Sequence, residues 1–507
     1  MAEPVGSQDS RPAPEGRQAP RTECASSQVC HPGAVSDPLR PTFPGVTFPG
    51  ATFPGAPDPA PSDSPRARGS ALPGGTRIHM VPGGTSPAQV AELFQAISSL
   101  LATSLPATAP GSADTRRTSD DAEGHGAPAA SPSQPSAPST LLVPVAPGED
   151  LAALRERLER VQAQGVPPSA DLILRTSGSS SGRGSLVAMS VAALISSARA
   201  TYARLDGPGR WVLALPAHHV AGLQVLVRSA LAGYPPVVVD THAGFSTQAL
   251  AEGLEEVLSQ RGPAPVYTSL VPTQLLRCLE DPRAVAALAR AAAVLVGGAA
   301  TDPALYERAL AAGLRVVRTY GMSETGGGCV YDGLPLDGVS VRLLDPDDDG
   351  VGRIVLAGPV LAEACWEGSS LLRPGPDGRV ELLTSDRGRL DDGVLTVLGR
   401  LDDVIVTGGV KVEPRVVEEA VASLAGVAQC CVVAVPDAQW GAAVVAVVVA
   451  SPGQSLDAEG LRAAARARLD GAHAPKHVLV VDRLAERGPG KVNRRAVAAL
   501  ARARLVG

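Results

Sequence analysis

Apolar and polar positions alternate in blocks over the middle of the chain, where short apolar runs are separated by longer segments with apolar residues at helical spacing. Short runs bounded by turn residues predict buried strands, and the spacing between them predicts helices. Strands are expected at 172–174, 211–215, 237–239, 266–269, 294–296 and 316–318, and helices at 221–232, 273–279 and 304–312. This alternation predicts an α/β fold with mainly parallel sheets flanked by helices.

The same kind of pattern extends toward the N-terminus. Residues 87–101 place apolar side chains at helical spacing, which predicts an amphipathic helix. Residues 141–145 form an apolar run that predicts a short strand, and a second helical pattern follows at 149–164.

The pattern of apolar runs and turns changes in the second half of the chain. From 339 to 398 the apolar runs shorten and Asp-Gly turns multiply, which predicts a small β subdomain. A compact α+β stretch follows. We therefore expect a large N-terminal domain at 70–398 and a small C-terminal domain at 399–507.

Composition sets two segments apart. Glycine and proline number 54 and 46 in 507 residues, and half of the prolines lie in the first 140. Residues 1–69, with a Thr-Phe-Pro-Gly repeat at 42–56, and residues 105–139 have no sizeable apolar face that could offset the entropy of ordering. We predict that both are disordered, a docking tail being the alternative for the first.

Charge, cysteine content and hydropathy exclude several classes of protein. The net charge is 45 − 51 = −6, which argues against nucleic acid as a partner. The 7 cysteines form no CxxC pair, so neither a structural zinc site nor a disulfide scaffold is indicated. The longest apolar run, 442–450, is about half of a membrane span. We expect a cytoplasmic protein without a membrane span, with a homo-oligomer left open.

A loop rich in hydroxyls and glycine follows the expected strand at 172–174. Residues 175–185 read RTSGSSSGRGS, and the backbone N–H groups of such a loop can turn inward around phosphates. It is not a Walker A loop, because no Gly-Lys-Ser/Thr follows. A flexible linker is the alternative, which the position after a buried strand disfavours. The predicted phosphate-binding residues are Thr176, Ser177, Gly178, Ser179, Ser180, Gly182 and Arg183.

A second cluster, TYGMSETG at 319–326, follows another expected strand. Ligands of α/β sheets bind at such strand ends. Tyr320 offers a flat ring for a base, and Glu324 offers a hard oxygen ligand for Mg²⁺.

Three more motifs follow in order: TSDRG at 384–388, GRLDD at 399–403 and GPGKV at 488–492. With all five, the chain resembles the adenylate-forming superfamily of acyl-CoA synthetases, luciferases and peptide-synthetase adenylation domains. The resemblance implies a large and a small domain, with ATP, Mg²⁺ and coenzyme A as cofactors. It also implies two steps: a carboxylic acid attacks ATP to give acyl-AMP and pyrophosphate, and a thiol then displaces AMP.

The resemblance further implies roles for individual residues. The loop at 176–183 would hold the β- and γ-phosphates and Glu324 the Mg²⁺, while Asp386 and Arg400 would bind the ribose, and Lys491 would be the catalytic lysine of the adenylation step. The residues expected around the nucleotide are Gly298, Ala299, Tyr320, Gly321, Ser323, Asp386 and Arg400. Those expected at the domain hinge and the coenzyme A side are Asp402, Gly409 and Lys411.

The expected lysine has a simple electrostatic purpose. Carboxylate and triphosphate repel each other, and a cation between them is worth roughly 4 kcal/mol per contact at about 4 Å and an effective dielectric constant near 20. The lysine must leave before the thiol enters, which gives a mobile domain its purpose. The phosphate loop departs from the family's Thr-Gly-x-Pro-Lys, so Arg183, or Ser185 with backbone N–H groups, would have to replace the missing lysine.

The nature of the acid is predicted from residues 215–223 and the helix after them. His219 aligns with the family's histidine at the acyl pocket and is also a candidate catalytic residue, a satisfied helix N-terminus being the alternative. Arg228 interrupts an apolar helix; a surface arginine is its alternative. Around Arg228 and Ser269 the chain is similar to the 2-succinylbenzoate–CoA ligases of menaquinone biosynthesis. A buried second carboxylate needs a cationic partner, for which Arg228 or His219 is the candidate.

Two other hypotheses remain open at this stage. The chain could activate another small aromatic or short-chain acid. Alternatively, it could be a non-catalytic nucleotide-binding module, in which replacement of Lys491 would change nothing measurable.

Overall fold

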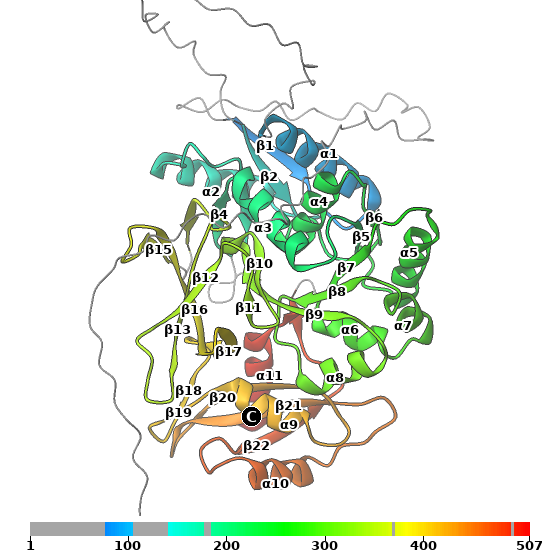
Figure 1. The fold of residues 1–507 in the computed structure, drawn as a ribbon. Helices are drawn as coiled ribbons and strands as arrows, with labels where there is room; N and C mark the ends of the chain where they lie inside the picture. The colour runs from blue at the N-terminus through cyan, green and yellow to red at the C-terminus, as the bar shows by residue number, and fades with distance from the viewer. Residues whose placement is uncertain (1–76, 105–139, 177–183, 368–370, 488–490, 507) are drawn as a thin grey trace, which may run out of the picture. The chain divides into compact units, whose positions relative to one another are not determined.

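The computed structural model describes residues 77–104, 140–176, 184–367, 371–487 and 491–506 (Figure 1). The segments predicted to be disordered, 1–69 and 105–139, lie outside these ranges, as do the predicted phosphate-binding residues Ser177, Gly178, Ser179, Ser180, Gly182 and Arg183.

The first sheet, sheet A, has the strand order β1-β2-β3-β4-β14. Its first three strands are parallel, whereas β4 and β14 join antiparallel. Its strands are β1 (Arg77–Pro82), β2 (Thr140–Val145), β3 (Leu172–Arg175), β4 (Leu186–Met189) and β14 (Ala364–Trp366), accompanied by the helices α1 (Pro87–Ser104), α2 (Leu151–Gln164) and α3 (Val191–Arg204). The predicted helix at 87–101 and strand at 141–145 are confirmed, whereas the sequence analysis did not identify β1.

The second sheet, sheet B, has the order β11-β10-β9-β8-β7-β5-β6. The five strands from β9 to β6 are parallel, and β10 and β11 continue antiparallel. The strands are β5 (Arg210–Leu213), β6 (Val237–Val238), β7 (Val266–Leu270), β8 (Ala293–Gly297), β9 (Val316–Met322), β10 (Gly327–Tyr331) and β11 (Leu334–Pro335). This confirms a mainly parallel arrangement.

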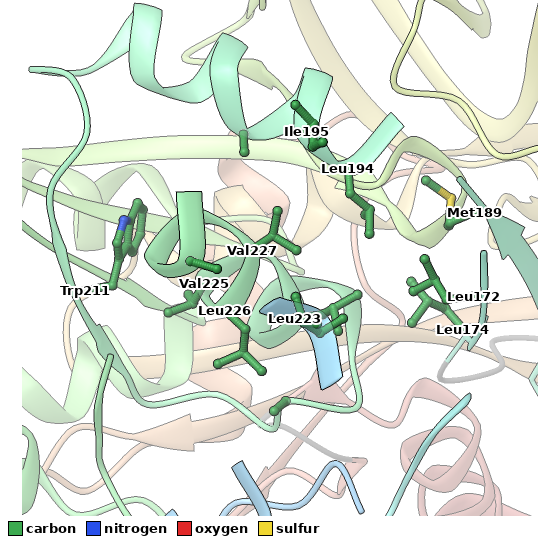
Figure 2. Close-up of a cluster of buried hydrophobic side chains, with 14 of the residues drawn as sticks. Leu172, Leu174, Met189, Leu194, Ile195, Trp211, Leu223, Val225, Leu226 and Val227 are labelled. Atoms are coloured by element: carbon green, nitrogen blue, oxygen red, sulfur yellow. The ribbon is translucent and has the colours of Figure 1, made fainter. Parts of the chain in front are cut away.

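Helices cover both faces of sheet B because its strands are apolar on both sides. Trp211 and Leu295 belong to the apolar cluster that includes α1, α3 and α4, whereas Val212 and Val294 belong to the cluster with α5 to α8. Figure 2 shows the first cluster, with Trp211 beside α4. The helices are α4 (Val220–Ala232), α5 (Thr247–Ser259), α6 (Pro272–Cys278), α7 (Pro282–Leu288) and α8 (Pro303–Ala311).

The third sheet, sheet C, is antiparallel and confirms the predicted β subdomain. Aspartates in left-handed conformation, Asp345 and Asp392, form two of its turns. Its strands are β12 (Ser340–Leu344), β13 (Val351–Ala357), β15 (Leu371–Pro374), β16 (Val380–Asp391) and β17 (Val394–Arg400).

The C-terminal segment has apolar clusters of its own, formed by residues between 405 and 505. Its central strands β20 and β21 are antiparallel, and β22 joins β21 in parallel. The elements are β18 (Ile405–Thr407), β19 (Val410–Val412), α9 (Pro414–Ala422), β20 (Val427–Asp437), β21 (Gly441–Ala450), α10 (Ala458–Arg468), β22 (His477–Val481), β23 (Glu486–Arg487), β24 (Lys491–Val492) and α11 (Arg494–Val506). The domain boundary at residue 399 stays a prediction.

In the described ranges no helix combines the length and the apolar character that a bilayer span requires.

Candidate active site

The predicted nucleotide residues gather where the parallel strands of sheet B end. Gly297, the last residue of β8, pairs with Thr319 of β9, and a Cβ atom on Gly297 would lie 2.2 Å from Oγ1 of Thr319. Gly298 follows with φ +79°, a left-handed conformation that favours glycine. Ala299 beside it is exposed. The absence of a side chain at Gly297 lets the ends of β8 and β9 approach, and Gly298 leaves room for another group at this edge of the sheet.

Lys491, from the C-terminal segment, lies against this edge. A Cβ atom on Gly298 would stand 3.1 Å from Cε and 3.6 Å from Nζ of Lys491. The charge of Lys491 is also among the causes that lower the pKa of His219. The predicted catalytic lysine thus lies beside Gly298, one of the residues predicted around the nucleotide, and its charge acts on the predicted acyl-pocket histidine.

A hydrogen-bonded carboxylate joins β9 to sheet C. The hydroxyl of Tyr320 donates to Oδ2 of Asp386 at 2.8 Å, and Nη1 of Arg400 lies 3.9 Å from Oδ1. The pKa of Asp386 is raised above its ordinary value by burial, and the hydrogen bond from Tyr320 and the charge of Arg400 offset only part of this rise. Arg400 also forms a two-pronged contact with Asp402, the predicted hinge residue, at 2.9 and 3.2 Å. Four predicted residues therefore form one network.

Glu324 sits in the turn between β9 and β10. The turn is the short 3₁₀ helix Ser323–Thr325, and Gly326 ends it in left-handed conformation with φ +59°. Thr325 closes the turn, because its Oγ1 accepts from the N–H of Met322 at 2.9 Å and donates to the carbonyl of Gly327 at 2.7 Å. The neighbouring Gly321 approaches the carbonyl oxygen of Gly327 so closely that a Cβ atom would lie 2.0 Å from it.

The donor set fits Mg²⁺ bound mainly by a nucleotide. Glu324 supplies one buried carboxylate at a strand end, and no group of three or more His, Cys, Asp or Glu suited to a metal ion occurs in the described residues. Mg²⁺ bound with nucleotide phosphates keeps several waters and takes only one or two carboxylates from the protein.

Hydrogen bonds join the two ends of the predicted phosphate loop, Thr176 and Ser185. The N–H of Thr176 donates to the carbonyl of Ser185 at 2.9 Å, and the N–H of Ser185 donates to Oγ1 of Thr176 at 2.8 Å. The hydroxyl of Ser185 donates to the carbonyl of Glu367. These bonds close the loop at the hairpin of β3 and β4, while its remaining predicted residues lie outside the described ranges.

The two histidines before α4 have different surroundings. His218 is held by the carbonyl of Gly83, which accepts from its backbone N–H at 2.7 Å and lies 2.7 Å from its Nδ1. His219 is the N-cap residue of α4 without a side-chain capping bond, so the capping alternative does not apply to it. Burial, followed by the charges of His218, Lys491 and Arg175, lowers the pKa of His219 to about 3.

Arg228 lies in a buried niche formed by three aromatic side chains. Its exposed fraction is 3%, and its guanidinium carbon stands 5.1 Å above the ring of Trp211. One Nη lies 3.5 Å from the hydroxyl of Tyr331, and Nε has no hydrogen-bond partner in the described structure. Tyr202 donates to the backbone carbonyl of Arg228. The surface-arginine alternative is therefore wrong.

The other predicted residues of the acid and hinge regions occupy separate places. Ser269 is buried near the end of β7. Arg228 follows His219 by nine residues on the same helix, roughly 13 Å along its axis. Gly409 occupies the tight turn between β18 and β19 with φ +83°, and Lys411 on β19 is exposed. The roles assigned to these residues stay predictions.

Sequence reasoning did not identify several partners of these residues. Gly83, Trp211 and Tyr331 come from distant parts of the chain and carry no local signal. Gln224, whose Nε2 donates to the carbonyl of Gly326 at 2.7 Å, could have been noticed, because it is a polar residue in an apolar helix, four positions before Arg228.

The sequence is similar to those of known enzymes over most of its length. The sequence pattern of the AMP-binding enzyme family matches residues 107–366, and that of the AMP-binding enzyme C-terminal domain matches residues 416–491. A probable 2-succinylbenzoate–CoA ligase from Mycobacterium tuberculosis is 42% identical over 367 residues, covering 71% of this chain and 90% of the relative.

Two solved structures share the fold. ATP-bound MatB from Rhodopseudomonas palustris has a TM-score of 0.60 at 23% identity, covering 72% of this chain and 84% of its own. The o-succinylbenzoate CoA synthetase MenE from Bacillus subtilis, in complex with the acyl-adenylate OSB-AMP, has a TM-score of 0.56 at 23% identity, covering 71% and 77%. These findings confirm the predicted enzyme class over the non-catalytic alternative. The chain belongs to the family of AMP-binding enzymes, as an adenylate-forming acyl-CoA ligase.

Proposed function

We propose that the enzyme converts 2-succinylbenzoate to its coenzyme A thioester through an acyl-adenylate, the reaction carried out in menaquinone biosynthesis. The observation that carries this proposal is the guanidinium of Arg228, which is buried and forms no salt bridge with an acidic side chain within the described residues. The similarity to the mycobacterial relative, whose name includes the same acid, supports it.

A buried cation without an acidic partner favours an anionic ligand. Removing a charge from water is costly unless a partner of opposite charge is supplied. Among the described residues, the groups that contact the guanidinium of Arg228 are the face of Trp211 and the hydroxyl of Tyr331. A dicarboxylic acid could provide the missing partner with the carboxylate that does not react, leaving the other to be activated.

Arg228 is a better candidate than His219 for this pairing. With a pKa of about 3, His219 is uncharged at neutral pH and offers no full charge to a carboxylate. Its place at the start of α4, with the charge of Lys491 among the causes that lower its pKa, favours a role for His219 at the reacting end of the acid instead.

At the nucleotide end, Asp386 would accept hydrogen bonds from the ribose hydroxyls while Tyr320 and Arg400 hold its orientation. Glu324 would hold Mg²⁺, which supplies charge neutralisation for the phosphates when bound. Thr176 and the loop after it would cradle the β- and γ-phosphates. The ammonium of Lys491 would lie between the attacking carboxylate and the α-phosphate, reducing their repulsion.

The reaction has two steps. A carboxylate oxygen forms a bond to the α-phosphorus of ATP, and the bond to the bridging oxygen breaks to release pyrophosphate. The sulfur of coenzyme A, its proton lost to solvent, then bonds to the acyl carbon, and AMP leaves. For this second step Lys491 must withdraw by rotation of the C-terminal segment at Asp402, bringing Gly409 and Lys411 toward the acyl-adenylate.

The proposal is tested with the full-length enzyme, ATP, Mg²⁺ and a panel of acids containing 2-succinylbenzoate, benzoate, ferulate and a medium-chain fatty acid. ATP–pyrophosphate exchange reports the first step, and thioester formation with coenzyme A reports the second. We expect kcat/KM for 2-succinylbenzoate to exceed that for each monocarboxylic acid by about 100-fold, the cost of leaving a buried charge unpaired. A higher value for benzoate, ferulate or the fatty acid would overturn the proposal.

A further inference from the structure

One buried hydrogen bond links the acid-binding helix to the turn that carries Glu324. Gln224 of α4 has an exposed fraction of 1%, and its Nε2 donates to the carbonyl oxygen of Gly326 at 2.7 Å. Its Cγ would lie 3.3 Å from a Cβ atom placed on Gly327. The side chain therefore packs tightly against the end of the turn.

The bonded carbonyl belongs to the residue that ends the turn. Gly326 donates its N–H to the carbonyl of Ser323 at 3.2 Å and adopts the left-handed conformation. The hydroxyl of Ser197 on α3 also approaches the Gly326 carbonyl, at 3.5 Å, which is the limit of a hydrogen bond. Of these two hydrogen bonds from helices to the carbonyl of Gly326, the one from Gln224 is the shorter.

The same helix face carries the proposed acid ligand. Gln224 and Arg228 are four residues apart on α4, so their side chains leave the helix on the same side. Arg228 contacts Tyr331 at the end of β10, the strand that begins directly after the turn. A displacement of α4 when an acid binds would therefore reach both ends of β10.

We propose that Gln224 is a positioning residue, which holds the Glu324 turn through Gly326 and thereby couples acid binding at α4 to binding of the metal–nucleotide complex. The inference rests on the proposed function for the role of Glu324, but not for the identity of the acid. Groups that orient a metal ligand without touching the metal typically change affinity by about 10- to 100-fold when removed.

The test compares Gln224→Met, which keeps the length of the side chain but removes the amide, with two other variants. Ser197→Ala removes the longer contact to the same carbonyl. Leu250→Ala removes buried apolar volume in α5, on the opposite face of sheet B, and serves as a control for lost stability.

The first measurement is amide hydrogen exchange of residues 323–327 in the ligand-free enzyme. We expect at least about 10-fold faster exchange in Gln224→Met, a smaller increase in Ser197→Ala and no local change in Leu250→Ala. Exchange equal to that of the wild type in Gln224→Met would overturn the proposal.

The second measurement is equilibrium binding of Mn²⁺ with ATP, followed by the paramagnetic resonance of Mn²⁺, with and without the best acid of the panel. Binding should weaken by about 10- to 100-fold in Gln224→Met, and the effect of the acid on it should disappear. Binding and acid effect equal to those of Leu250→Ala would refute the coupling. Because the acid is chosen by the panel, a wrong substrate assignment would leave this test intact.

Discussion

Two ionisable side chains of the N-terminal part, the partly buried Asp386 and the buried Arg228, differ in the counter-charge that the protein supplies. The carboxylate of Asp386 receives a hydrogen bond from Tyr320 and faces Arg400. The guanidinium of Arg228 has an indole face, one phenol at 3.5 Å and an Nε without a partner in the described structure. Asp386 therefore has a positively charged neighbour within the protein, whereas Arg228 has no acidic neighbour among the described residues.

This difference indicates what each end of the site can bind. A compensated carboxylate can orient neutral hydroxyls without demanding a charged ligand, which suits a ribose. An uncompensated buried cation instead favours a ligand that brings a negative charge. Lys491 is a third case, because it comes from the C-terminal segment and lies beside Gly298 at the end of β8.

The largest effect should come from removing that third charge. In Lys491→Ala we expect acyl-adenylate formation to fall by about 10²–10³-fold, because the repulsion between carboxylate and triphosphate is no longer offset. ATP binding and thioester formation from supplied acyl-adenylate should persist. The chain has two other lysines, Lys411 and Lys476; Lys476, paired with Asp437 on the surface, provides the control Lys476→Ala. A loss below threefold would contradict the assigned role.

Removing the uncompensated charge should act on one class of acid only. In Arg228→Met we expect kcat/KM for 2-succinylbenzoate to fall by about 100-fold, because the second carboxylate loses its buried partner. Activity with benzoate, where detectable, should change less than threefold. Arg290→Met, at an exposed position, is the matched control. An equal loss for both acids would show that Arg228 acts through packing rather than charge.

Neutralising the compensated charge should have a smaller effect. In Asp386→Asn the amide oxygen can still accept from Tyr320, but the charge that favours ribose hydroxyls is lost. We expect KM for ATP to rise about 10-fold, corresponding to about 1.4 kcal/mol for hydrogen bonds to a charged group. The measurement is ATP–pyrophosphate exchange at saturating acid, with the exposed Asp391→Asn as control. A changed KM for the acid alone would argue against a ribose ligand.

The remaining effect acts on stability and its pH dependence rather than on the reaction rate. The lowered pKa of His219, about 3 against 6.5, means that the unfolded chain takes up a proton in this window while the folded protein does not. Stability should therefore fall as the pH decreases from 6.5 toward 3, by at most about 1.4 kcal/mol per pH unit for this group. Denaturant unfolding at several pH values should show a shallower decline in His219→Asn, whereas exposed His242→Asn should match the wild type.

Local sequence patterns were sufficient to predict the parallel strands of sheet B and the individual motifs. Strands β5 to β9 and helices α4, α6 and α8 lie within a few residues of their predicted bounds, because their apolar runs pack into the clusters on the two faces of sheet B. Helices α5 and α7 and strands β10 and β11 had no predicted counterpart. Strand β1 was not predicted, because its charged and apolar residues do not form an apolar run.

Contacts between residues of different motifs could not be predicted from local sequence patterns. The hydrogen bond from Tyr320 to Asp386 spans 66 residues, and that from Gln224 to Gly326 spans 102. The partners of Arg228 come from β5, α3 and β10. Such pairs depend on how sheets and helices pack, which neither residue spacing nor composition encodes.

The niche around Arg228 uses other elements than the proposed nucleotide site. It is built from the middle of α4 and side chains packed on one face of sheet B, while Asp386, Arg400 and Lys491 belong to other elements. A redesign for a different acid can therefore be confined to a few interior positions. Exchanging Arg228 together with Trp211 and Tyr331 would change the proposed acid pocket, with the hydrogen bond from Gln224 to Gly326 left in place to hold the Glu324 turn.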